Sequence, residues 1–168
     1  NQHLGQGPTM FGVEFSAFIV AQVFLQTPIG AASDRYGRKP FILGGLLVLV
    51  PATLAQGIVT TPLGMIVTRL VQGAAAATAF APGFALAGDI ARSGNSGTTF
   101  SVLTMSFTLG TAIGPLVAGY LVDFGYLTPF AFGAVLAAGG ALLVYSQVEE
   151  THAASTGGAG GAQPAAQD

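Results

Sequence analysis

Charged residues are scarce in this sequence, and cysteine is absent from it. Only five Lys or Arg and seven Asp or Glu occur among the 168 residues, whereas a soluble domain of this length carries about 40 charges. This scarcity excludes an ordinary soluble enzyme, and the absence of cysteine excludes a disulfide scaffold. The net charge of −2 gives no indication of nucleic-acid binding. Because 51% of the residues are hydrophobic, a disordered chain is also excluded, and an integral membrane protein remains.

Five apolar stretches are long enough to cross a bilayer, which requires about 20 residues of helix. The first contains Glu14 and the third contains Arg69, whereas the other three carry no charge. The first also contains Gln22 and Gln26, which should face protein or a water-filled cavity because lipid offers no partner. The sequence lacks the short alternating segments of a membrane barrel and predicts an all-α, polytopic bundle of five transmembrane helices in residues 1–150. The expected spans are residues 11–33, 41–59, 63–88, 98–122 and 127–148.

The connectors between these stretches are short and polar, so successive helices should be antiparallel neighbours. Outside the spans, basic residues occur only in the first and third connectors, which the positive-inside rule places in the cytoplasm. These residues are Arg35, Arg38, Lys39 and Arg92. The N-terminus is then expected outside and the C-terminus inside, where residues 151–168 have the composition of a disordered cytoplasmic tail. Because the chain begins with Asn1 and not with Met, we expect at least one further helix upstream.

The first connector carries a compact motif of glycines and charges. Residues 30–40 read GAASDRYGRKP. Asp34 lies at the end of one helix and close to the start of the next, where a carboxylate can bind free backbone N–H groups. Gly37 permits the sharp turn.

This motif resembles the loop between helices 2 and 3 of the major facilitator superfamily. Two further segments resemble motifs of the same family, in helix 4 and in helix 5 of its drug/proton antiporter branch. The first contains Arg69, Gln72 and Gly73, and the second contains Gly110, Gly114, Pro115 and Gly119. The resemblance covers about residues 10–151. It implies that the five spans are helices 2 to 6, a partial N-terminal domain of a twelve-helix transporter without helix 1 and the second half.

The resemblance also implies a role for the motif in the first connector. It would gate the cytoplasmic side of the transporter as a latch between the two halves, with Arg38 as a candidate partner of Asp89. The gating residues would be Gly30, Asp34, Arg35, Gly37, Arg38, Lys39 and Asp89. The alternative is that these basic residues only fix the orientation in the membrane.

Arg69 and Glu14 are the charges inside the expected spans. An arginine at the membrane centre costs at least about 2.5–3.5 kcal/mol. Arg69 lies six residues after Leu63, so one interpretation is a side chain that snorkels to the outer interface. The other is a charge in the transport pathway, beside Gln72 and Gly73, that helps proton coupling or substrate binding. Glu14 lies at a similar depth and could pair with Arg69, take up a proton or lie in interfacial water.

Gly110, Gly114 and Ala118 recur every four residues and form a stripe of small side chains that another helix can approach closely. Pro115 removes a backbone hydrogen bond and can bend the helix. Generic helix packing explains the stripe. The resemblance implies a sharper alternative, in which a kinked helix 5 packs across the interface between the two domains.

The sequence contains no metal-ligand cluster, nucleophile triad or phosphate-binding glycine loop, so we expect no enzyme activity, no metal and no cofactor. Energy would come from a proton gradient. We expect a multi-pass plasma-membrane protein that transports small molecules by alternating access, with proton-coupled efflux as the favoured mode. Its partners would be the lipid bilayer, a small-molecule substrate and the remaining helices of the transporter. A sugar or metabolite symporter or uniporter and a non-transporting truncated scaffold are the alternatives.

Overall fold

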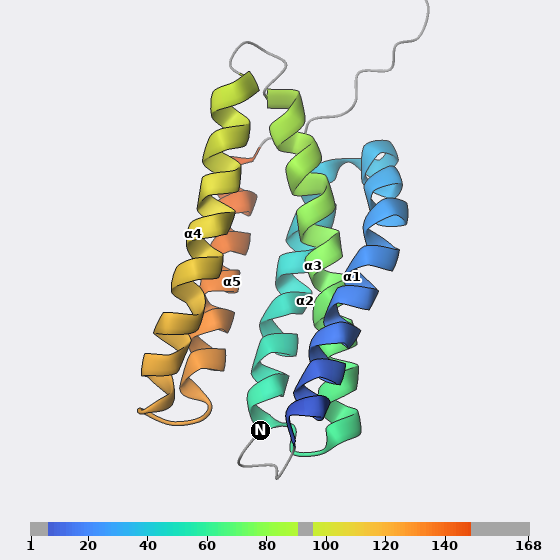
Figure 1. Cartoon of the computed structure of the whole chain (residues 1–168). Helices are drawn as coiled ribbons and strands as arrows, with labels where there is room; N and C mark the ends of the chain where they lie inside the picture. The colour runs from blue at the N-terminus through green and yellow to red at the C-terminus, as the bar shows by residue number, and fades with distance from the viewer. Residues whose placement is uncertain (1–6, 91–95, 149–168) are drawn as a thin grey trace, which may run out of the picture.

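The computed structural model describes residues 7–90 and 96–148, and it is a bundle of long helices (Figure 1). The helices are α1 Pro8–Tyr36, α2 Arg38–Ile58, α3 Pro62–Ile90, α4 Ser96–Val122 and α5 Thr128–Gln147. All five are long and apolar enough to cross a membrane. The predicted all-α bundle of five membrane-spanning helices is confirmed. The expected tail at residues 151–168 and the basic residue Arg92 lie outside the described residues.

The helices extend into the connector that carries the glycine and charge motif. α1 continues to Tyr36 and α2 begins at Arg38, so Gly37 alone separates them. The φ angle of Gly37 is 97°, a left-handed conformation that glycine adopts without the steric cost of a side chain. The motif is therefore mostly helical, whereas the sequence predicted a polar connector from residue 34 to residue 40. Asp34 lies in the last turn of α1, and Arg38 begins the first turn of α2.

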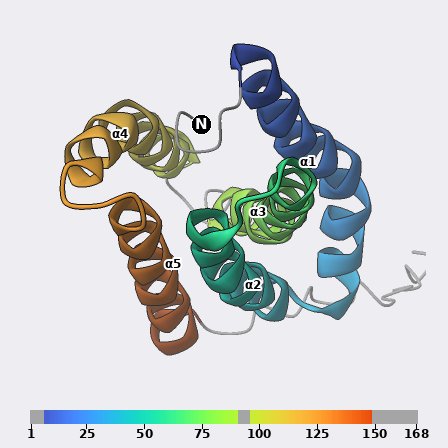
Figure 2. The same cartoon turned by 90° about the horizontal axis from the view of Figure 1, so that it is seen from below.

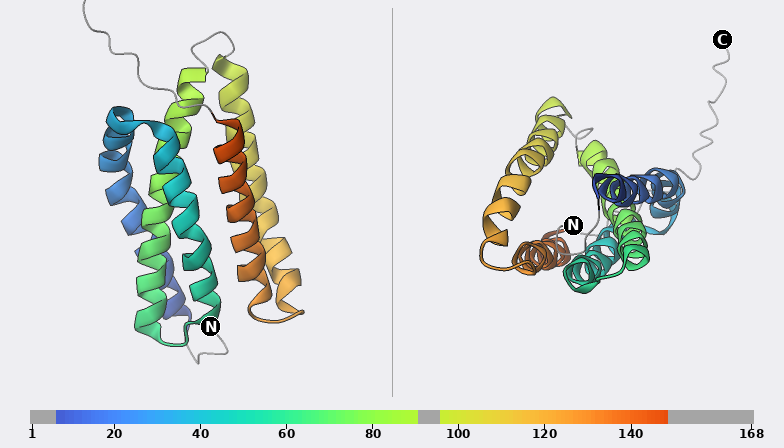
Figure 3. Two further views of the ribbon diagram at one scale, coloured as in Figure 1. Left: turned by 180° about the vertical axis from the view of Figure 1, so that it is seen from behind. Right: turned by 60° about the horizontal axis from the view of Figure 1, so that its bottom comes forward.

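α3 is the central helix of the bundle. It packs along both α1 and α2, whereas α5 packs on α2 and α4 touches α3 and α5 only lightly. Figures 2 and 3 show α2 between the α1–α3 pair and α5, with α4 at the edge. Consecutive helices run in opposite directions (Figure 1), but α1 and α2 are not close neighbours, contrary to the expectation from their short connector. α1 contacts α3 instead.

Small residues explain why α3 takes the central position. Residues 75–77 of α3 are alanines, and all three are buried. A Cβ atom on Gly73 would clash with the Phe18 carbonyl oxygen of α1. A Cβ atom on Gly45 of α2 would lie 2.7 Å from the Ala75 carbonyl oxygen. Without side chains at these glycines, both neighbouring helices approach the backbone of α3, which is how helices associate in a membrane without a hydrophobic driving force.

Much of the surface of α1 remains uncovered. Its membrane-spanning part is largely exposed among the described residues, and Gln26 is on that exposed surface. The described helices therefore do not bury Gln26, and the expectation that it faces protein or a cavity stays a prediction. α1 packs on α3 along one side only, and Gln26 lies away from that side.

Gly45→Ala should destabilise the bundle. The new methyl group would meet two backbone atoms of α3, the Ala75 oxygen and the Ala79 nitrogen, each at 2.7 Å, and such overpacking costs about 1–3 kcal/mol. Gly44→Ala is the matched control, because no described atom lies within 4 Å of its added Cβ and alanine favours helix by about 1 kcal/mol. Thermal unfolding in detergent should show a lower midpoint for the first variant only. Equal midpoints would contradict the close packing of α2 on α3.

Candidate functional site

A charged cluster lies at the end of the bundle where α1 and α3 end and α2 begins, at the top of Figure 1. The Arg38 guanidinium donates from Nη2 and Nε to Asp34 Oδ1, at 3.1 and 3.3 Å. Its Nη1 donates to Asp89 Oδ2 on α3. The side chain of Arg38 is 17% exposed, whereas those of Asp34 and Asp89 are 57% and 38% exposed. One planar guanidinium thus joins carboxylates from two helices, which the fork geometry of arginine allows.

The contact between Arg38 and Asp89, expected from the family resemblance, is formed in the structure. The expected capping role of Asp34 is wrong, because no described side chain caps the N-terminus of α2. Arg38 itself binds the Asp34 carboxylate, since it lies four residues later on the next helix. The Asp34 carboxylate therefore forms an ion pair with Arg38 and does not cap α2.

The remaining residues of the motif lie around this cluster. Gly30 packs beside Ala81 of α3, where an added Cβ would lie 3.9 Å from the alanine methyl. Arg35 is exposed in the last turn of α1. The Lys39 ammonium lies 5.6 Å from the centre of the Tyr145 ring on α5, within the range of a cation–π interaction. The motif therefore contacts α3 through Arg38 and α5 through Lys39.

In the first half of α3, away from the Arg38 cluster, a chain of hydrogen-bonded polar side chains joins α3 to α2. Arg69 Nη1 donates to Gln72 Oε1 at 3.2 Å, and Gln72 Nε2 donates to Thr53 Oγ1 of α2 at 3.2 Å. Gln72 is buried, and so is the Nε atom of Arg69. These contacts hold the guanidinium beside α2, inside the bundle. Gly73 lies next in sequence and forms the close contact with α1 described above.

Next to this chain is a cavity of about 340 Å³, in which side chains of α1, α2, α3 and α5 meet. Its polar lining comes from Glu14, Gln56 and Arg69. The rest of the lining is Phe11, Met65, Tyr126 and Phe130. Glu14 is 3% exposed, which contradicts a position in interfacial water. Glu14 and Arg69 form no direct ion pair in the part of the chain that the structure describes, so the two charges share the cavity without touching.

The sequence does not single out three residues of this region, Thr53, Gln56 and Tyr126. The second span carries no charge, and the hydroxyl of Thr53 and the amide of Gln56 do not by themselves indicate a site. A signal was nevertheless available. Thr53 and Gln56 are three residues apart and so lie on one face of α2, which is the face that meets α3. Tyr126 lies in the turn before α5, and only the fold brings it to the cavity.

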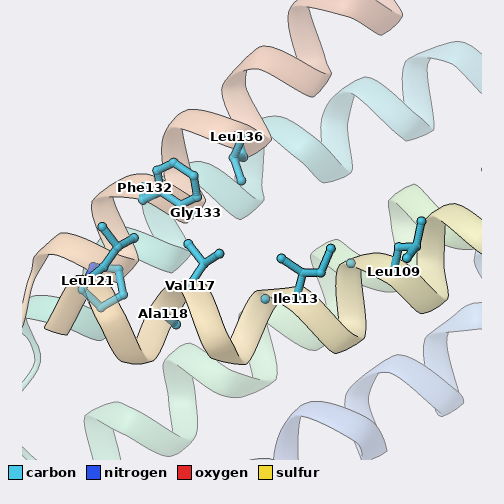
Figure 4. Close-up of a pocket in the computed structure, with 11 residues that line it drawn as sticks. Leu109, Ile113, Val117, Ala118, Leu121, Phe132, Gly133 and Leu136 are labelled. Carbon is cyan, nitrogen blue, oxygen red and sulfur yellow. The ribbon is translucent and has the colours of Figure 1, made fainter.

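The stripe of small residues on α4 lies along an apolar groove between α4 and α5 (Figure 4). The groove has a volume of about 460 Å³, and Phe132 and Gly133 of α5 form its other wall. A Cβ on Gly110, Gly114 or Gly119 would meet no described atom within 4 Å. Packing among the described helices therefore does not explain these glycines. The helix also contains Pro115, in line with the sequence motif.

The fold and these clusters define the class of the protein as a polytopic membrane protein that keeps polar and charged side chains between apolar helices. The family model of the Major Facilitator Superfamily matches residues 1–167. The chain therefore belongs to the Major Facilitator Superfamily, and the resemblance of its motifs to that family is confirmed.

Three relatives illustrate the membership. The chain is 31% identical over 150 residues to an uncharacterized MFS-type transporter of Methanocaldococcus jannaschii, a match that covers 89% of the chain and 39% of the relative. It is 32% identical over 127 residues to the class H tetracycline resistance protein of Pasteurella multocida, with 76% and 32% covered. It is 29% identical over 131 residues to multidrug resistance protein 2 of Bacillus subtilis, with 78% and 32% covered. The chain thus spans between 32% and 39% of the length of these relatives.

Proposed function

We propose that the chain is part of a secondary active transporter that exports small molecules in exchange for protons by alternating access. The observation that carries this proposal is the polar chain of Arg69, Gln72 and Thr53 beside the buried Glu14. Ionisable groups inside a membrane bundle are costly, and they mark ion or substrate pathways. The names of two relatives, a tetracycline resistance protein and a multidrug resistance protein, support export as the direction.

In this proposal the cluster around Arg38 is the gate on the cytoplasmic side of a plasma membrane. The N-terminus then lies outside and the C-terminus in the cytoplasm, in agreement with the positive-inside rule. Arg38 fixes the turn between α1 and α2 against Asp89 of α3. Arg35 and the exposed part of the Asp34 carboxylate can contact the second half of the transporter, and loss of this contact between the halves would open the cytoplasmic side.

Two further parts of the structure have roles in this proposal. Arg69, Gln72, Gly73 and Glu14 lie along the pathway, where Glu14 can exchange a proton with the outer side. The open groove along α4, which Gly110 and Gly114 line, receives a helix from the remaining part of the transporter, and Gly119 leaves further room beside it. The proton gradient supplies the energy, and the protein acts as a carrier rather than an enzyme.

Inverted membrane vesicles from cells that express the full-length protein test this function. With an acidic interior, they should take up tetracycline or the dye ethidium, which corresponds to export from a cell. An uncoupler should reduce uptake to that of vesicles without the protein. Uptake that is insensitive to the uncoupler would favour a uniporter. No uptake of these compounds or of a panel of sugars and metabolites would contradict transport and favour a scaffold.

A further inference from the structure

Three buried polar atoms around the 340 Å³ cavity have no hydrogen-bond partner among the described residues. They are Glu14 Oε1, Gln56 Nε2 and Arg69 Nε. Glu14 and Gln56 are only 3% and 2% exposed, so bulk water does not satisfy them from the surface of the described chain. Buried polar groups in folded proteins are nearly always paired. Three unpaired atoms around one cavity therefore point to a guest that the cavity receives.

The chemistry of the three atoms defines the polar part of this guest. Glu14 Oε1 is an acceptor and needs a donor, whereas Gln56 Nε2 and Arg69 Nε are donors and need an acceptor. The other bonds of Arg69 do not meet this need, because its Nη1 is already bound to Gln72. A guest that satisfies all three atoms must both donate and accept hydrogen bonds. A purely cationic or purely anionic head group would be attracted by one charge of the site and repelled by the other.

The rest of the lining defines the apolar part of the guest. Phe11, Phe130 and the ring of Tyr126 provide aromatic walls, and Met65, which is 4% exposed, provides a polarizable side chain. Ligand pockets have this composition, a mostly apolar lining with a few polar groups that fix orientation, and volumes from about 300 Å³ upward. The cavity fits a small molecule with one ring.

We propose that this cavity binds a small, uncharged amphipathic molecule, with its ring against the aromatic walls and a carboxamide-like head group at Glu14, Gln56 and Arg69. The head group donates to Glu14 Oε1 and accepts from Gln56 Nε2 and Arg69 Nε. The inference concerns binding at this cavity and does not require that the bound molecule is the transported compound. Binding itself can be measured without transport, so the two proposals can fail separately.

Three probes with the same phenylpropyl body and different head groups test the proposal. 3-Phenylpropanamide is neutral and has a donor and an acceptor, 3-phenylpropylamine is a cation, and 3-phenylpropanoate is an anion. Calorimetric titration of the purified full-length protein in nanodiscs should show the amide binding about tenfold more tightly than either ion, because each ion leaves a buried group of the site unpaired. Equal affinities for the three probes, or no binding at millimolar concentration, would overturn the proposal.

Substitutions locate the binding in this cavity. Gln56→Leu removes one donor and should weaken binding of the amide about tenfold, the factor expected for one lost hydrogen bond to a buried group. Gln26→Leu is the matched control, because Gln26 is an exposed glutamine of α1 that does not line the cavity. Binding of the amide that is unchanged by Gln56→Leu would contradict the site. If that variant does not fold, the order of affinities of the three probes on the unmodified protein decides.

Discussion

Arg69→Leu should reduce transport by the full-length protein at least about tenfold, because a hydrogen bond from a charged group is worth about 1.5–3 kcal/mol and the substitution removes the charge as well. The loss should not come from a failure to insert. Leucine avoids the cost of about 2.5–3.5 kcal/mol that an arginine carries inside a membrane helix, so the amount of protein in the membrane should be retained. A defect in transport without a defect in abundance would assign Arg69 to the pathway.

The measurement is the initial rate of tetracycline or ethidium uptake into inverted vesicles, divided by the amount of the protein in the same membranes. Gln26→Leu serves as the control. It also replaces a polar residue within a span, but the exposed Gln26 side chain belongs to neither cluster. An Arg69→Leu protein that transports at the unmodified rate would show that Arg69 only anchors α3 near the interface. In that case the polar chain to Gln72 and Thr53 would be structural.

Arg38→Lys should also impair transport strongly, although it keeps the positive charge. An ammonium group lacks the planar fork with which Arg38 holds Asp34 and Asp89 at once, so the contact between the motif turn and α3 is lost or weakened. The carboxylates of both ion pairs are partly exposed to solvent, and lysine keeps the positive charge beside them, so the stability of the bundle should change by only about 0–1 kcal/mol. We expect a loss of transport of about fivefold or more, the factor that corresponds to about 1 kcal/mol.

This variant separates the two interpretations of the motif. If the basic residues only fix the orientation in the membrane, lysine is equivalent to arginine at residue 38 and transport is unchanged. If Arg38 holds the gate, Arg38→Lys is impaired, and exchange of the pair by Arg38→Asp with Asp89→Arg restores part of the rate. The comparison is between the transport rates of the unmodified protein, the lysine variant and the exchanged pair, measured in the same vesicles. Full activity of the lysine variant would contradict the gate.

The helices could be predicted from the sequence because the thickness of a bilayer sets the length of an apolar run. Their ends could not, because hydropathy does not distinguish a polar helix end from a polar connector. Asp34 and Arg38 are such ends. The position of α1 against α3 also escaped prediction. It depends on Gly73, and nothing in a sequence with 25 glycines marks that one as a contact between helices.

The two clusters differ in how far the sequence revealed them. The contact between Arg38 and Asp89 could be expected, because the family resemblance supplies a pair of residues 51 positions apart that no local pattern connects. The cavity at Glu14 could not be assembled from the sequence, since its lining comes from four helices and from the turn before α5. Gln56 in particular is an uncharged residue in an uncharged span, and only its burial and an Nε2 atom without a partner among the described residues distinguish it.

The direction of proton movement during substrate transport tests the exchange of substrate for protons most directly. The full-length protein would be reconstituted in liposomes that contain a pH-sensitive dye, with the membrane potential clamped and no initial pH gradient. Ethidium, a permanent cation, would then be added outside, with protein-free liposomes as the control. Exchange predicts that protons leave as ethidium enters and that the interior becomes more alkaline. Acidification would show symport, and ethidium entry without a pH change would show uniport; either result would contradict the proposed antiport.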